Sequence, residues 1–179
     1  MAMTPTTVFR YFRGDETTRP QELIYGVVRE PPAPFPYHQG VVTHLTSAMH
    51  VHVREHELGS VYVSPIDVVL DEARALVLQP DIIFIAATRR EIVRDRVWGA
   101  PDLVVEVLSS ATARRDRTEK LGWYRQYGVR ECWLVDPTDE CVDVVNCTMP
   151  DEGARFAGAQ VIRSRVLPSF TPRAQDLFV

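Results

Sequence analysis

Long hydrophobic runs are absent from this 179-residue sequence, and cysteine is scarce. No apolar stretch approaches the roughly 20 residues that a membrane-spanning helix needs. The N-terminus, MAMTPTTVFRYFRGDE, also lacks the apolar core of a secretory signal. The three cysteines, Cys132, Cys141 and Cys147, are odd in number and close together, which indicates reduced thiols rather than a disulfide framework. We therefore expect a cytoplasmic protein that does not span a membrane.

An excess of positive charge is missing as well. The formal net charge of -4 argues against a coat of basic side chains that would bind nucleic acid indiscriminately. Residues 86–130 nevertheless hold ten basic residues against six acidic ones, which could follow a phosphate backbone or form a solvated helix face. The composition, 45% hydrophobic and 25% charged, excludes disorder as the main state. The length predicts a single domain over residues 1–179, with residues 1–20 as a loose arm or short helix.

Lysine occurs only once, as Lys120 among 19 arginines. Chance is the simpler explanation, since a composition with little lysine still yields one or two. The alternative is chemistry that arginine cannot perform, because a compact ammonium acts as a point charge and can exchange a proton, whereas a guanidinium stays protonated and planar. The count marks Lys120 as a candidate functional residue.

Apolar periodicity divides the rest of the chain into strands and two helices. Apolar residues at three-to-four spacing predict an amphipathic helix over residues 38–57, after a stiff proline-rich connector, and a second helix over 113–127 that ends at Gly128. Alternating or continuous apolar runs predict strands. These strands lie within residues 22–29, 60–70, 75–79, 81–86, 102–108, 131–136, 141–146 and 156–165.

This order of elements predicts an α/β or α+β domain built on a mixed sheet. We expect the strands at residues 81–86, 102–108 and 131–136 to be neighbours in one sheet, with the helix at 113–127 packed on it. The strand at 102–108 should be central, since its run DLVVEVL is almost continuously apolar.

Glu106 is the exception within that apolar run. A buried carboxylate is unfavourable by several kcal/mol unless it is paired, hydrogen-bonded or bound to a metal. It could form a salt bridge with an arginine, or act as a metal ligand or general base. Asp102 shares its face of the strand but lies about 13 Å away, too far to share an ion. Asp81, which follows Pro80 at a strand start, is either a turn residue or a partner of Glu106 on the neighbouring strand.

Lys120 is predicted to lie level with Glu106, because the helix after the strand folds back along the sheet. The alternative is an exposed ion pair between Lys120 and Asp116, four residues earlier on the helix. Two carboxylates and a lysine suit a metal-dependent phosphodiesterase: the carboxylates hold Mg²⁺, and the ammonium stabilises the charge that develops on the phosphate. We expect the carboxylates of Asp81 and Glu106 to lie within about 5–6 Å of each other. If they do not, Asp67 or Glu22 would be the missing ligand.

Other metal-binding patterns are weaker. His52 and His56 stand four residues apart on the first predicted helix, but the HExxH pattern is absent. Cys141 and Cys147 lack the CxxC spacing and the second ligand pair of a zinc site.

Nearly the whole chain resembles the Uma-two family of restriction-endonuclease-like proteins. The similarity is carried by QPDIIF at residues 79–84 and by GAPDLVVEVLSSATARRDRTEKLGWYRQYGVRECWLVDP at 99–137. It extends to ELIYGVV, the His38-Gln39 pair, DVVL at residues 67–70 and the closing PSFTPRAQDLF. The resemblance implies the fold of the PD-(D/E)XK nucleases, a mixed β-sheet flanked by helices, here with additional N- and C-terminal strands.

The resemblance also implies a site and an activity. Asp81 matches the motif aspartate and Glu106 the second acid, so both would bind Mg²⁺ or Mn²⁺. The motif lysine would stand at Leu108, and Lys120 on the following helix takes its place. The implied function is a metal-dependent endonuclease that hydrolyses DNA and forms a homodimer. The alternative is a non-catalytic nucleic-acid-binding or regulatory module on the same fold.

Overall fold

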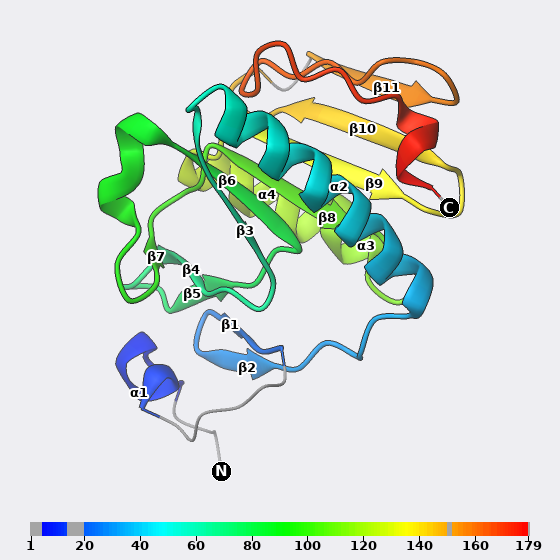
Figure 1. The fold of residues 1–179 in the computed structure, drawn as a ribbon. Coiled ribbons are helices and arrows are strands. Elements are labelled where there is room, and N and C mark those ends of the chain that lie inside the picture. The colour runs from blue at the N-terminus through cyan, green and yellow to red at the C-terminus, as the bar shows by residue number, and fades with distance from the viewer. Residues whose placement is uncertain (1–4, 14–19, 150–151, 179) are drawn as a thin grey trace.

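The computed structural model describes residues 5–13, 20–149 and 152–178. Its strands form two mixed β-sheets, and helices pack against these sheets (Figure 1). The first has six strands in the order β11-β10-β9-β8-β6-β3. Their bounds are β3 (Gly59–Val63), β6 (Ile82–Ala86), β8 (Leu103–Val107), β9 (Glu131–Asp136), β10 (Cys141–Asn146) and β11 (Gly153–Ala157).

The centre of the six-stranded sheet confirms the predicted strand order. β8 pairs with β6 on one side, antiparallel, and with β9 on the other, parallel. Every residue of β8 is buried, as a nearly continuous apolar run requires. The sheet is therefore mixed, and Glu106 lies in one of its innermost strands.

Helices cover the two faces of this sheet. The helix α2 (Pro36–Glu55) buries an apolar stripe on one face, where Val41 and Leu45 join Val105 and Trp133 in one core. The other face is covered by α3 (Ala113–Arg115), a π-helical turn η2 (Asp116–Lys120) and α4 (Leu121–Tyr127). Figure 1 shows α2 crossing in front of the strands and α4 behind them.

The five-stranded sheet follows the order β2-β1-β5-β4-β7. Its strands are β1 (Glu22–Ile24), β2 (Val27–Arg29), β4 (Val68–Asp71), β5 (Leu76–Leu78) and β7 (Val97–Trp98). The short helix α1 (Val8–Phe12) packs on it through Val8, which contacts a small core that includes Leu23 and Val77. The N-terminal hairpin expected at residues 22–29 is thus confirmed, and its pairing with β5 makes it part of a second sheet.

Several expected boundaries differ from the structure. The strand expected at residues 156–165 is β11, which ends at Ala157, because the chain then turns at Gly158 with φ of +55°. The helix expected over 113–127 is interrupted by the π-helical turn η2. Two 3₁₀ helices, η1 (Ala87–Ile92) and η3 (Ala174–Leu177), complete the described elements. Of the N-terminal arm expected over 1–20, residues 1–4 and 14–19 lie outside the described residues.

The three cysteines are free and buried, in agreement with the expected thiols. Within residues 5–13, 20–149 and 152–178, no helix has both the length and the apolar character needed to cross a membrane.

Candidate active site

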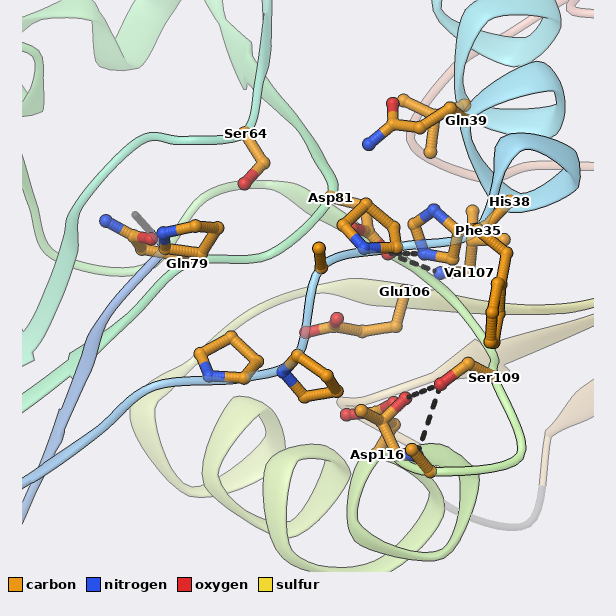
Figure 2. A pocket seen from close by; sticks show the side chains of 18 of the residues that line it. Phe35, His38, Gln39, Ser64, Gln79, Asp81, Glu106, Val107, Ser109 and Asp116 are labelled. Atoms are coloured by element: carbon orange, nitrogen blue, oxygen red, sulfur yellow. Dashed lines mark hydrogen bonds and ion pairs between the residues drawn. The ribbon is translucent and has the colours of Figure 1, made fainter. Parts of the chain in front are cut away.

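A cavity of about 360 Å³ brings the predicted site residues together (Figure 2). The N-terminal end of α2 and the connector before it form one side, and the loop after β8 with η2 forms another. The ionisable side chains that line the cavity come from five parts of the chain: Glu22, His38, Asp81, Glu106, and the helical segment with Arg115, Asp116 and Lys120.

Asp81 is positioned at the start of β6. The register Ile82↔Val105 places Asp81, one residue earlier, opposite Glu106, one residue later on β8. The backbone N–H of Val107 donates to Asp81 Oδ2 at 2.7 Å, and His38 Nε2 lies 3.3 Å from the same oxygen. Both carboxylates therefore face one cavity, as the sequence predicted, while their sharing of an ion stays a prediction.

Glu106 is paired with lysine instead of arginine. Lys120 Nζ donates to Glu106 Oε1 at 3.0 Å and to Oε2 at 3.1 Å, and the Tyr124 hydroxyl donates to Oε1. Only 3% of Glu106 is exposed. Burial raises the pKa of Glu106 to about 8; Lys120 opposes the rise, whereas the nearby carboxylate of Asp116 adds to it.

Lys120 does not occupy the exposed helix position that the sequence alternative assumed. It is only 6% exposed, because η2 turns its side chain toward β8 and Glu22 covers it from the other sheet. The ion pair with Asp116 does form, at 3.6 Å, but inside the protein. Burial lowers the pKa of Lys120, but the carboxylates of Glu106 and Glu22 outweigh it and hold the pKa above its usual value.

Glu22 joins the site from the five-stranded sheet. Its Oε1 lies 3.1 Å from Lys120 Nζ and accepts from the backbone N–H of Gln79, while Oε2 lies 2.7 Å from Arg115 Nη2. Burial alone would raise the pKa of Glu22, but Lys120 and Arg115 bring it below its usual value. Asp67, the other alternative ligand, lies outside the cavity lining and pairs with Arg96 at 3.0 Å.

Two further residues belong to the site, although sequence reasoning assigned no role to either. His38 stands on the first turn of α2, and Asp81 raises its pKa even though burial opposes this. Tyr124 lies on the apolar side of α4, as periodicity predicted, yet its hydroxyl reaches Glu106. Asp102 lies apart from them: its carboxylate accepts from the backbone N–H of Ala86 and pairs with Arg89, as expected for a structural role.

In the part of the chain that the structure describes, no group of three or more His, Cys, Asp or Glu side chains is arranged to hold a metal ion. His52 and His56, the weaker candidate pair, each place a ring nitrogen 2.9 Å from a backbone carbonyl, that of Pro168 for His52 and that of His52 for His56. The carboxylates that line the cavity are those of Glu22, Asp81, Glu106 and Asp116.

The fold is similar to that of a solved structure described as a putative nuclease belonging to DUF820, from Anabaena variabilis. The match has a TM-score of 0.82 and 19% sequence identity, and covers 97% of this chain and 98% of the other. No curated protein matches the chain. A family model described as "Uma2: Putative restriction endonuclease" matches residues 8–171, which include every residue of the cavity named above. The chain therefore belongs to the Uma2 family.

Proposed function

We propose that the chain is a metal-dependent endonuclease that hydrolyses phosphodiester bonds in DNA. The observation that carries the proposal is the meeting of Asp81, Glu106 and Lys120 in one cavity, from two adjacent strands and the helix that follows. The family description supports a nuclease in general. Our proposal goes beyond that description in two respects: the metal ion is magnesium, and the substrate is DNA.

The donor set fits a divalent cation. Four carboxylates line the cavity, from Glu22, Asp81, Glu106 and Asp116, against two permanent cations, Arg115 and Lys120. Carboxylate oxygens are the ligands that Mg²⁺ and Mn²⁺ prefer, and a cation would balance the excess negative charge. We assign the cation to Asp81 and Glu106, because they lie opposite each other at the adjacent strands β6 and β8 and both line the cavity.

The protein's own side chains then have separate tasks. A bound divalent ion would polarise the phosphate and make its water ligand more acidic. Lys120 would place its ammonium beside a phosphate oxygen, where it stabilises the extra negative charge of the pentacoordinate state. Glu22 and Glu106 hold that ammonium in place, and His38 with the Val107 N–H holds Asp81.

The alternative is a non-catalytic nucleic-acid-binding or regulatory module. It is favoured by the completeness of the Lys120 contacts, since three carboxylates already surround the ammonium. In that case the cluster would join the two sheets, and its acids would bind no metal.

Plasmid cleavage in Mg²⁺, in Mn²⁺ and in EDTA distinguishes the two functions. We expect cleavage only with metal, and a loss of more than roughly a hundredfold in Asp81→Asn and Glu106→Gln. Asp67→Asn is the matched control, because Asp67 lies outside the cavity lining, and it should cleave like the wild type. Absence of cleavage in every metal, together with absence of Mn²⁺ binding by calorimetry, would favour the non-catalytic module. The homodimer expected from the sequence stays a prediction that sedimentation equilibrium checks.

A further inference from the structure

We propose that the cavity receives one nucleotide of a single DNA strand, with the ring of Phe35 stacked on its base. This inference rests on the proposed function, because it assigns the form of DNA that reaches Asp81 and Glu106. The inferred mode of binding differs from that of an enzyme that acts on the outside of an intact duplex.

The acidic side chains are recessed. Glu106 is 3% exposed, and only 21% of the Asp81 side chain reaches solvent. The cavity volume, about 360 Å³, lies near the lower end of the range for small-ligand pockets. A duplex keeps its bases stacked inside, so an enzyme that takes a base into a pocket acts on a single strand or on an extruded nucleotide. A single strand, which can bend one nucleotide into the cavity, should therefore bind more tightly than an intact duplex.

The wall of the cavity is apolar and stiff. The residues that connect β2 to α2 line it in sequence: Pro31, Pro32, Ala33, Pro34 and Phe35. Proline fixes the backbone angle φ and carries no N–H, so this stretch offers a rigid surface with few hydrogen-bond donors. Such a surface contacts the faces of bases without reading their edges.

Phe35 ends this wall with an unusually exposed aromatic ring. Its exposed fraction is 72%, although it lines the cavity, and Figure 2 shows it among the residues around Glu106. Among the described residues, no aromatic ring and no arginine stacks on it. Aromatic side chains beside a strand path bind successive bases by stacking, whatever the base.

The charges of the cavity favour stacking as the source of affinity. Arg115 and Lys120 are the two permanent cations of its lining, and Glu22 pairs with both. Because carboxylates of the protein already balance both charges, a phosphate that enters the cavity releases few counterions. We therefore expect the contribution of Phe35 to binding to change little with salt concentration.

Fluorescence anisotropy with labelled oligonucleotides tests the inference independently of cleavage. The probes are a non-self-complementary single strand and a duplex of the same sequence closed by hairpin loops at both ends, each in Ca²⁺ and in EDTA. We expect the single strand to bind at least about tenfold more tightly than the closed duplex. Phe35→Ala should weaken single-strand binding roughly five- to a hundredfold, the range found for one stacked base, and Phe35→Trp should restore it.

Phe9→Ala is the matched control, because Phe9 is 66% exposed on α1 and lies outside the cavity lining. It should bind DNA like the wild type, and circular dichroism should show that both alanine variants melt like the wild type. Four results would each overturn the inference. They are equal affinity for the two probes, unchanged single-strand binding by Phe35→Ala, tighter binding of an RNA strand of the same sequence, and no DNA binding. Single-strand binding without cleavage in any metal would overturn the proposed hydrolysis alone. Cleavage of the closed duplex by the Phe35→Ala variant would overturn the single-strand inference and leave the proposed hydrolysis standing.

Discussion

Lys120 combines a proposed catalytic task with a structural one, since it lies between Glu106 and Glu22 in the interior. We predict that Lys120→Arg abolishes metal-dependent cleavage, because the larger planar guanidinium cannot occupy the place of the ammonium. The same variant should lose about 1–3 kcal/mol of unfolding free energy by overpacking, measured by urea denaturation. A surface lysine would have tolerated arginine, but burial removes that tolerance.

The control for Lys120→Arg is the reverse exchange at an exposed position of the same helical segment. Arg125→Lys on α4 should leave both the urea midpoint and cleavage unchanged. Wild-type stability together with wild-type cleavage in Lys120→Arg would contradict both tasks assigned to Lys120.

The thiols should be unreactive in the folded protein. Burial raises the pKa of Cys147 to about 11 and that of Cys132 well above its usual value, and burial also raises the pKa of Cys141. A raised pKa lowers the thiolate fraction at every pH below it, and the thiolate is the reactive form. We predict that a disulfide reagent titrates the three cysteines slowly at about pH 8 and rapidly once guanidinium chloride unfolds the chain. One fast-reacting thiol in the native protein would contradict this burial.

At the scale of single elements, the C-terminal end of α4 depends on Gly128. This residue has φ of +93°, and an added Cβ would meet no atom within 4 Å, so backbone strain alone opposes substitution. We predict that Gly128→Ala lowers the unfolding free energy by about 1–2 kcal/mol. Gly122, exposed within the same helix and also without a nearby atom, is the matched control: Gly122→Ala should raise stability by about 0.5–1 kcal/mol. Thermal melting of the two variants in opposite directions checks the prediction.

Elements with strong periodicity could be predicted from the sequence alone. The amphipathic helix expected over residues 38–57 is α2, whose buried apolar stripe includes Val41, Leu45 and Val53. The π-helical turn η2 could not be predicted, because no local residue preference marks it. It depends on the burial of Asp116 and Lys120 beside Glu106, and this burial arises from long-range packing.

The candidate site likewise contains residues whose placement the sequence predicts and residues whose placement it does not. Asp81, Glu106 and Lys120 were predictable because adjacent strands and a returning helix fix their relative level. The role of Glu22 was open, since only the pairing of β1 with β5 brings a distant segment to Lys120. The assignment of residues 1–179 to one domain stays a prediction.

At the scale of the whole molecule, Glu22 links the two sheets, because its partners Lys120 and Arg115 belong to the helical segment on the six-stranded sheet. We predict that Glu22→Gln lowers the unfolding free energy by about 2–4 kcal/mol, since the buried Lys120 and the partly buried Arg115 lose a charged partner. Trp98 in β7 and Trp133 in β9 report on the two sheets separately. Their fluorescence in single-tryptophan variants should change at one urea midpoint in the wild type. Two separate midpoints would show that the sheets unfold independently.

The proline stretch that walls the cavity has a consequence for how this chain can diversify. Pro31, Pro32 and Pro34 lie between β2 and α2, outside the strand pairing of either sheet, so neither sheet depends on their identity for that pairing. Mutations there can widen or narrow the cavity mouth without the loss of stability that follows changes in β6 or β8. Under the proposed function, substrate range would therefore drift, or be engineered, through a short exposed segment while the carboxylates and Lys120 stay fixed.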